Sequence, residues 1–379
     1  MENPKLALIP SGYKSGKVYS ILPVNGVGDF DFDRASKGTR VREDGLIEEV
    51  TDNVPRLDWY DSNCPSLLLE PQRTNYALNS GDASQWATVS GSQSVTKTQN
   101  YAISPDGTHT AARIQANATG SNYSLIQLST SSFIGNYAGS VYLKSNTGNT
   151  ENVIVYGRNT SVTSYPIGNE WQRIEIQGSG TSGQNLYLFL GSFPNNGSDE
   201  NVDILVWGGQ LEQGTYTSSY IPTPSITTRI EDVCGNSGSA DLFDITEGSF
   251  FVDVLPYNAG LVSTISLSNN STSQRILIQF QSNGTQVRLF SSGGVSNYQT
   301  ITFNQRNKIL VTFKLNEYKF YINGALVSTD TIATVPTGLD RVNFSNSTAN
   351  SDFFQGEVND TRVYDRVLTE AEAIKLTTI

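Results

Sequence analysis

The segment YKFYINGALVST at residues 318–329 decides how this chain folds. Apolar and polar residues alternate on both sides of Asn323-Gly324. An Asn-Gly pair between two such runs is a strong signal for a two-residue β-hairpin, because both turn positions tolerate positive φ. The same rhythm continues outward in both directions, which predicts antiparallel β-structure across the C-terminal part of the chain.

Two series of short alternating runs cover most of the chain. Residues 240–379 contain SFFVDVL, LVSTISL, RILIQFQ, TQVRLF, KILVTFK, RVNFS and GEVNDTRVYDR. Residues 76–228 contain AARIQA, YSLIQLS, YAGSVYLKS, NVIVYGR, WQRIEIQG, NLYLFLG and VDILVWGG. Even spacing with intervening turn signals indicates two antiparallel sandwiches or jelly rolls. Pro, Gly and Ser interrupt the rhythm near residue 228, where we expect a domain boundary.

Residues 1–75 form a third, different segment, because Pro, Asp and Arg cluster there and the alternation is brief. KVYSILPV at 17–24 is its clearest strand candidate. Phe30 and Phe32 then alternate with aspartates, and Asp44-Gly45 predicts a turn. We therefore expect an extended N-terminal segment, followed by sandwiches at 76–228 and 229–379.

The convincing helix signal lies at the C-terminus. Thr369 and Glu372 form a capping box that opens the segment TEAEAIKL. We expect Ile374 and Leu376 to dock on the last sandwich. The predicted fold class is all-β, with an N-terminal extended docking segment, two antiparallel sandwiches and one short C-terminal helix.

Composition limits the classes of partner. The 379 residues exceed the size of one core, and 25 basic against 36 acidic residues give a net charge of -11. That charge repels nucleic acid and anionic membrane surfaces. We find no signal peptide and no apolar run of membrane-spanning length, so we expect neither membrane insertion nor secretion. Cys64 and Cys234 are too few for a disulfide framework, and we expect both to be reduced.

Residues 30–75 carry the most diagnostic resemblance. The stretches RASKGTRVREDGLIEE, PRLD and LLLEPQRTN resemble a segment that recurs in structural proteins of tailed bacteriophages. The resemblance implies docking onto the virion and self-association. Its candidate docking residues are Phe30, Phe32, Arg40, Arg56, Trp59 and Arg73.

Two further stretches resemble sugar-binding families. DASQWATVSG, SPDGTHTAARI, WQRIEI and VWGGQLEQGTYTSSYIPT resemble jelly-roll carbohydrate-binding modules. SFFVDVL, YINGALV and FFQGEVNDTRVYDRVLTEAEAIKL resemble the concanavalin-like, laminin-G and pentraxin group. A fold hosts many roles, so sugar binding is an expectation until a site is identified.

The resemblances together imply a virion surface protein, made in the bacterial host cytoplasm. Its expected partners are other virion proteins of the capsid, portal or tail, copies of itself in a homo-oligomer, by analogy a trimer, and host surface glycans. A tail adsorption protein and a capsid decoration protein both fit. A purely structural protein without glycan binding is the alternative, and a polysaccharide depolymerase is a third.

Exposed aromatic rings are the first candidates for sugar contacts. We expect Trp86, Trp171 and Trp207 to pack in cores, because large aromatic side chains dominate buried area. Tyrosines in turn-rich places are better candidates. They are Tyr101, Tyr123, Tyr165, Tyr257 and Tyr298.

Metal binding and catalysis have weaker signals. Concanavalin-like modules often carry calcium, for which Asp106, Asp352 and Asp360 are candidate ligands, but the sequence contains no spaced calcium loop. Turn formation is the simpler interpretation of these residues. The chain has a single histidine, His109, and lacks GxSxG and phosphate loops. We therefore expect no catalytic residue and no certain cofactor.

Overall fold

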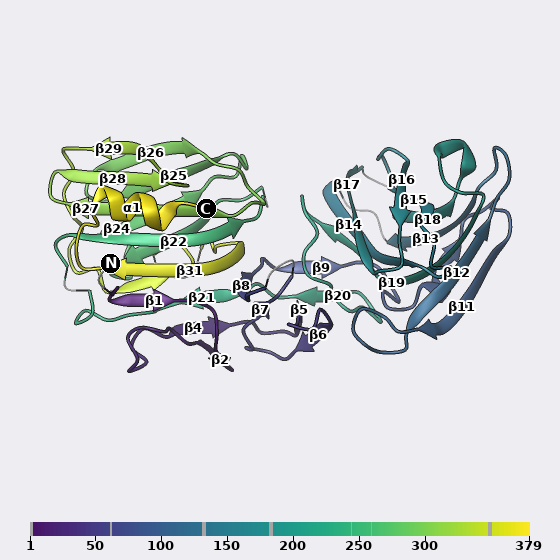
Figure 1. Cartoon of the computed structure of the whole chain (residues 1–379), viewed down its shortest axis with the longest axis horizontal. Helices are drawn as coiled ribbons and strands as arrows, with labels where there is room; N and C mark the ends of the chain where they lie inside the picture. The colour runs from purple at the N-terminus through teal and green to yellow at the C-terminus, as the bar shows by residue number, and fades with distance from the viewer. Residues whose placement is uncertain are drawn as a thin grey trace. The chain divides into compact units, whose positions relative to one another are not determined.

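The computed structural model describes residues 3–60, 63–130, 134–181, 185–243, 245–258, 260–347 and 351–379. Within these ranges it is all-β apart from one α-helix and two 3-10 turns, and it divides into two compact units (Figure 1). Unit 1 comprises Met1–Glu43, Val50–Gln72 and Ile230–Ile379. Unit 2 comprises Asp44–Glu49 and Arg73–Arg229.

The N-terminal segment does not form a unit of its own. Strand β1 (Leu6–Leu8) and strand β8 (Ser66–Leu69) both pair antiparallel with β31 (Gly356–Tyr364), close to the end of the chain. Unit 2 is therefore inserted between two parts of unit 1. The expected order of three consecutive segments could not reveal this pairing, because alternation specifies a strand but not its distant partner.

Two antiparallel sheets form the sandwich of unit 1. The first, sheet I, has the order β29 (Ala325–Asp330), β28 (Glu317–Ile322), β27 (Asn307–Lys314), β22 (Gly248–Pro256), β31, β8, β7 (Leu57–Asp58), with β1 also on β31. The second, sheet II, has the order β26 (Val295–Thr300), β25 (Gln286–Ser291), β24 (Arg275–Phe280), β23 (Ser263–Ser268), β30 (Arg341–Asn343). The hairpin expected at Asn323-Gly324 is confirmed, with φ of 49° and 84° between β28 and β29.

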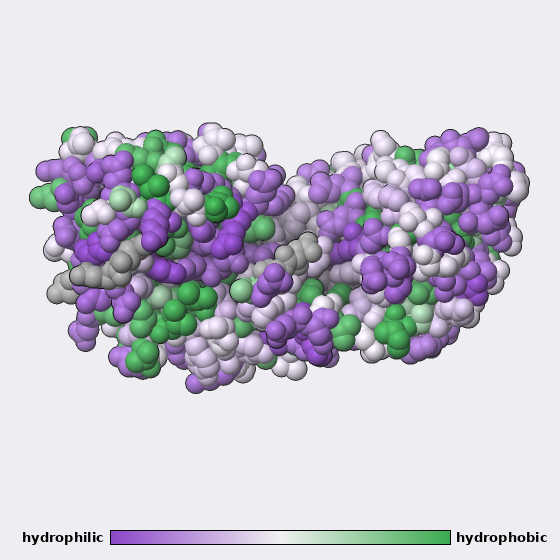
Figure 2. Space-filling model, viewed as in Figure 1, coloured by the Kyte–Doolittle hydropathy of each residue, from purple (hydrophilic) through white to green (hydrophobic). Residues whose placement is uncertain are grey.

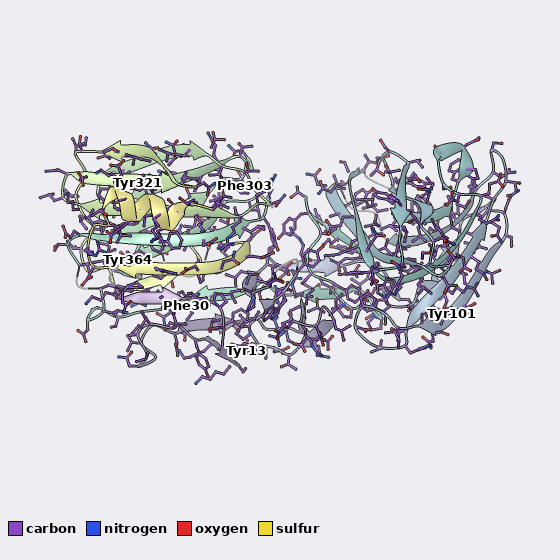
Figure 3. All side chains as sticks on the ribbon, viewed as in Figure 1. Tyr13, Phe30, Tyr101, Phe303, Tyr321 and Tyr364 are labelled. Carbon is purple, nitrogen blue, oxygen red and sulfur yellow. The ribbon has the colours of Figure 1, made fainter. Side chains whose placement is uncertain are left out.

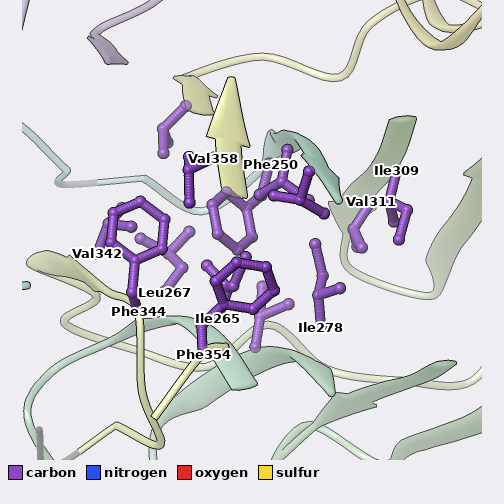
Figure 4. Packing of buried hydrophobic residues seen from close by; sticks show 14 of the residues in the cluster. Phe250, Ile265, Leu267, Ile278, Ile309, Val311, Val342, Phe344, Phe354 and Val358 are labelled. Carbon is purple, nitrogen blue, oxygen red and sulfur yellow. The ribbon is translucent and has the colours of Figure 1, made fainter. Parts of the chain in front are cut away.

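Inward-facing side chains of both sheets fill one apolar core. Figure 4 shows Phe250 of sheet I close to Ile265 and Ile278 of sheet II. The N-terminal strand β4 (Phe30–Asp33) adds to this core, since Phe30 stacks on Phe344 with ring centroids 5.1 Å apart. Phe32 is also buried.

Part of the N-terminal prediction is wrong. The strand expected at 17–24 is limited to β3 (Lys17–Val18), which pairs with β4. Beyond it the chain turns, because Ser20 donates its backbone N–H to Asp29 Oδ1 at 3.0 Å and Pro23 has no N–H to donate to a ladder. The turn leaves Tyr19, Ile21 and Val24 exposed.

The C-terminal helix α1 (Glu370–Thr377) lies against sheet I, beside Tyr321 and Tyr364 (Figures 1 and 3). Its capping box is confirmed, since Thr369 Oγ1 accepts from Glu372 N and Glu372 Oε2 accepts from Thr369 N. Leu376 packs against the sheet as expected. Ile374 is exposed, and Ala373 takes the buried place one turn before Thr377.

The helix cap makes a testable prediction. Hydrogen bonds from the Arg366 side chain and the Thr369 backbone lower the pKa of Glu372 from 4.5 to about 2. A carboxylate with a lowered pKa stabilises the fold above pH 4.5, and this contribution is lost as the pH falls towards 2. An NMR titration of the Glu372 carboxyl carbon should have its midpoint near 2.

Arg366→Gln should move that midpoint up towards 4.5 and loosen the first turn of α1 at pH values below it. Arg306→Gln is the control, because it removes the same charge from a guanidinium that pairs with Asp253 instead. A midpoint near 4.5 in the unmodified protein would contradict this account of the cap.

Unit 2 is a second sandwich. Sheet III has the order β10 (Ala87–Thr88), β13 (Ser124–Thr130), β18 (Leu186–Ser192), β15 (Glu151–Gly157), β16 (Thr163–Ile167). Sheet IV has the order β11 (Val95–Ala102), β12 (Ala111–Asn117), β19 (Asn201–Gln213), β14 (Gly135–Ser145), β17 (Gln172–Gly180). Trp86 and Trp207 are buried, as expected, whereas Trp171 is only half-buried. The entry strand β9 (Arg73–Asn75) pairs with the exit strand β20 (Thr227–Arg229).

A buried ionic cluster in unit 1 lies where the chain leaves that unit and returns. Asp232 accepts from Arg34 Nη1 at 3.1 Å and from Arg56 Nη2, and Glu70 Oε2 accepts from Arg56 Nη1 at 2.6 Å. Two more hydrogen bonds join the segments around Glu70 and Asp232: the Glu70 backbone N–H donates to the Asp232 side chain at Oδ2, and the Asp232 backbone N–H donates to the Glu70 carbonyl. Burial disfavours the charge of Arg56, but Asp232 and Glu70 outweigh burial and raise its pKa.

Unit 2 has its own buried polar cluster around Glu212. The carboxylate accepts from Ser218 N at 2.6 Å, from Ser218 Oγ at 2.7 Å and from Gln210 Nε2 at 2.9 Å. Arg73 Nε lies 3.8 Å from Glu212 Oε2. Burial raises the pKa of Glu212, although the Ser218 bonds and the charges of Arg73 and Arg229 act against this rise.

Candidate functional site

The five tyrosines expected to contact sugar lie in different environments. Tyr165 packs against the core of unit 2, Tyr257 donates to Glu357 Oε1 at 3.0 Å, and Tyr123 donates to Ser90 O at 2.7 Å. Tyr101 and Tyr298 are the exposed members, at 39% and 49%. Tyr101, Tyr123 and Tyr165 belong to unit 2, and Tyr257 and Tyr298 belong to unit 1.

The six residues expected to dock on a virion are mostly engaged within their own unit. Phe30, Phe32 and Arg56 are buried, which leaves their side chains unavailable to a partner surface. The remaining three are half-buried: the Arg40 side chain donates to Tyr13 Oη at 2.8 Å, the Trp59 backbone N–H donates to Val41 O, and the Arg73 guanidinium lies 5.1 Å above the Tyr216 ring.

The three candidate calcium ligands each have partners in the protein. Asp106 Oδ1 accepts from Ser104 Oγ and Thr108 N in a tight turn, Asp352 accepts from Asn346 Nδ2, and Asp360 binds Arg362 through both oxygens. Within the described ranges, no group of three or more His, Cys, Asp or Glu side chains could hold a metal ion. Cys234 is a buried free thiol, and Cys64 is exposed.

The exposed face of sheet II gathers the most promising set of side chains. Ile276, Ile278 and Leu289 point into the core, so the residues that alternate with them point outward. Gln279, Arg288 and Tyr298 form one cross-strand row, and Phe290 lies in the next row beside Ser296. We call the set Arg275, Gln279, Arg288, Phe290 and Tyr298 the arginine face.

Stacking and hydrogen bonds hold the two guanidinium groups over Phe290. Arg288 lies 4.7 Å from the Phe290 centroid and 5.4 Å from the Tyr298 centroid, and its Nε donates to Ser296 Oγ at 3.1 Å. Arg275 lies 5.3 Å from the same Phe290 centroid. Its Nη1 donates to Asn346 Oδ1 and, at 3.3 Å, to Ser347 Oγ. The donors are therefore pre-positioned on rigid strands.

Electrostatics on this face are unbalanced. Burial lowers the pKa of Arg275, the Asp352 carboxylate raises it, and the like charge of Arg288 lowers it further. Two cations thus share one aromatic ring in a chain whose net charge is -11. The face offers π-surfaces, guanidinium and amide donors, and a hydroxyl, which is the chemistry that recognises a saccharide.

Unit 2 presents a second aromatic surface on the exposed side of sheet III. Tyr156 stacks on Phe189 with centroids 4.7 Å apart, and Tyr187 lies 5.2 Å from Phe189. Arg158 lies 5.7 Å above the Tyr187 ring. We call Tyr156, Tyr187 and Phe189 the aromatic strip. All three are half-buried, and burial raises the pKa of Tyr156.

The sequence did contain a signal for the aromatic strip. In NLYLFLG, the leucines at 186, 188 and 190 alternate with Tyr187 and Phe189. Because the leucines fill the core, the rings must point outward. The rings lie inside strands β15 and β18, away from the turn-rich places in which sugar-contacting tyrosines were expected.

Figure 2 shows that hydrophilic residues dominate the visible surface of both units, with small apolar patches between them. Among the described residues no helix has the length and apolar character needed to cross a bilayer.

Comparison with known proteins supports the fold of the C-terminal region. Residues 250–373 match the family described as the Concanavalin A-like lectin/glucanases superfamily. No curated protein matches the chain.

Solved structures with a similar arrangement include the CBM40 module of Ruminococcus gnavus IT-sialidase bound to α2,3-sialyllactose, at 17% identity over 37% of this chain and 86% of that one, with a TM-score of 0.32. Domain 4 of the arabinanase AbnA from Geobacillus stearothermophilus, in complex with arabinotriose, is 16% identical over 43% of this chain and 82% of that one, with a TM-score of 0.33. A SAP-like pentraxin from Limulus polyphemus is 15% identical over 34% of this chain and 69% of that one, with a TM-score of 0.28. These structures carry no argument beyond likeness, and it is the family match that identifies residues 250–373 as a concanavalin A-like domain.

Proposed function

We propose that this chain is a non-enzymatic glycan-binding protein that contacts saccharides through the arginine face of unit 1. One observation carries the proposal: Phe290 and the half-exposed Tyr298 flank the Arg288 guanidinium on the two adjacent strands β25 and β26. An aromatic ring can pack against the apolar face of a pyranose, while guanidinium, amide and hydroxyl groups bond its oxygens.

The aromatic strip of unit 2 supports the same function as a second contact surface. Its rings offer apolar area, and the neighbouring Gln127 lies directly across the ladder from Phe189. Shallow sites on open sheet faces bind single sugars weakly. Several copies of the chain on one particle would bind together, so multivalency supplies the useful affinity. A homo-oligomer, by analogy a trimer, suits this mechanism.

We place this protein on the surface of a tailed-bacteriophage virion, after synthesis in the cytoplasm of the bacterial host. The support for this part of the proposal is the resemblance of residues 30–75 to segments of phage structural proteins. Capsid, portal or tail proteins would be the docking partners. Labelled antibody on intact virions tests the placement: label at the tail tip favours adsorption, label across the head favours decoration, and unlabelled particles refute it.

Tyr298→Ala should weaken glycan binding about two- to tenfold, because one stacking ring contributes about 0.5–1.5 kcal/mol. The measurement is titration of the full chain with the best ligand from an array of bacterial envelope glycans. Tyr101→Ala is the matched control, since Tyr101 is also exposed and also lies under an arginine, Arg113, at 5.0 Å.

Equal affinities for the unmodified protein and Tyr298→Ala would remove the arginine face from the proposal. If the full chain, displayed at high valency, binds no glycan on the array, glycan binding is refuted and a purely structural role remains. Cleavage of host capsule that is lost on changing one carboxylate would instead make it a depolymerase.

A further inference from the structure

The arginine face has a charge pattern that distinguishes it from the rest of the lectin-type sandwich. Six arginines lie between residues 250 and 379. Four of them pair with a carboxylate within 4 Å: Arg306 with Asp253, Arg341 with Asp340, Arg362 with Asp360 and Arg366 with Glu372. Among the described residues, Arg275 and Arg288 have no such carboxylate partner.

The partners that Arg275 and Arg288 do have are all neutral. Arg288 donates to Ser296 Oγ and, at 3.5 Å, to Gln279 Oε1, and Arg275 donates to Asn346 and Ser347. Neutral acceptors orient a guanidinium but leave its positive charge uncompensated. The carboxylate that interacts electrostatically with Arg275 is that of Asp352, which already accepts a hydrogen bond from Asn346 Nδ2 at 3.1 Å.

Placing two like charges over one ring costs free energy in the unbound protein, because each cation disfavours the other. Nothing in the strand register requires this arrangement, since neighbouring accessible positions on this face of sheet II carry uncharged residues, among them Gln279, Gln286 and Ser296. A bound anion would relieve the repulsion and accept hydrogen bonds from both guanidiniums.

We propose that Arg275 and Arg288 together bind the anionic group of an acidic saccharide, a carboxylate or a sulfate, whose pyranose ring packs beside them on Tyr298. The inference rests on the proposed function and adds the ligand class. Selectivity then follows from charge: the acidic sugar is held by the arginine pair, and its neutral counterpart has only the stacking contact.

The test follows the side-chain Nε–Hε signals of the full chain by NMR while three sugars are added: glucuronate, glucose 6-sulfate and methyl glucoside. Arg275→Gln and Arg288→Gln assign the two signals. Arg341→Gln is the matched control, because it removes the same charge from the same sheet but from a guanidinium that Asp340 already neutralises.

We expect an acidic sugar to shift the Arg275 and Arg288 signals at concentrations about tenfold lower than methyl glucoside requires, with weaker binding at high salt. Either arginine variant should abolish this preference, and Arg341→Gln should keep it. A response to glucuronate alone identifies a carboxylate site, and a response to glucose 6-sulfate alone identifies a sulfate site.

The two hypotheses fail in different ways. Equal shifts with the acidic and neutral sugars, or equal losses in all three variants, would overturn the anion site and leave glycan binding intact. No shift with any sugar, at the arginine face or the aromatic strip, would overturn both.

Discussion

Asp232→Ala should lower the free energy of unfolding of unit 1 by about 3–5 kcal/mol, because it removes one partner from a buried ionic cluster. Arg34 and Arg56 are almost fully buried and both donate to Asp232, so their charges would lose their main counterion inside the protein. Glu70 would also lose the acceptor for its backbone N–H. The measurement is unfolding by denaturant, monitored through hydrogen exchange of the backbone amides in β22 and β31.

Asp241→Ala is the control, because Asp241 is exposed in the same returning segment. Its replacement should change stability by less than about 0.5 kcal/mol. Asp232→Asn should fall between the two, since it keeps acceptor geometry on one side and loses the charge. If Asp232→Ala lowers the free energy of unfolding by less than about 1 kcal/mol, the ionic cluster does not hold together the segments around Glu70 and Asp232.

Glu212→Ala should lower the stability of unit 2 by about 3 kcal/mol, because a buried donor that loses its acceptor costs about 1–3 kcal/mol. Three donors would be affected: Ser218 N, Ser218 Oγ and Gln210 Nε2. The carboxyl oxygens accept these bonds whether or not the group is ionised, so the loss should persist across the acidic range. Hydrogen exchange in β14 and β19 reports on this unit.

Glu175→Ala is the matched control in unit 2, since Glu175 is exposed and only 3.6 Å from Arg173 in a surface ion pair. Hydrogen exchange in β22 and β31 reports on unit 1, and hydrogen exchange in β14 and β19 reports on unit 2, so each variant can be tested on both units. Glu212→Ala should leave the exchange of β22 and β31 unchanged, and equal destabilisation of both units would show that the local network is not the cause.

Local signals in the sequence predicted local structure well. The Asn323-Gly324 hairpin, the alternation of Phe30 and Phe32, and the Thr369 capping box each depend on neighbouring residues only, and each is present in the structure. The pairing of β1 and β8 with β31 depends on residues hundreds of positions apart. No periodicity encodes that partner, so the N-terminal segment looked independent.

The candidate site was only partly predictable for the same reason. Tyr298 was identified from its turn-rich surroundings, and it lies on the arginine face. Arg275, Arg288 and Phe290 come from two different strands, and only the cross-strand register brings them together. Likewise, Arg56 was expected to dock on a virion, but the fold buries it against Asp232.

The insertion of unit 2 also sets the order in which the chain can fold during synthesis. Unit 2 can close once Arg229 has left the ribosome, because its strands lie between Asp44 and that residue. Strand β1 must wait for β31, whose Val363 pairs with Leu6. At about 5–20 residues per second the wait is roughly 20–70 s. Until β31 is made, the edges of β1 and β8 that pair with it stay open on the nascent chain, and this last long strand of the sandwich is the one that covers them.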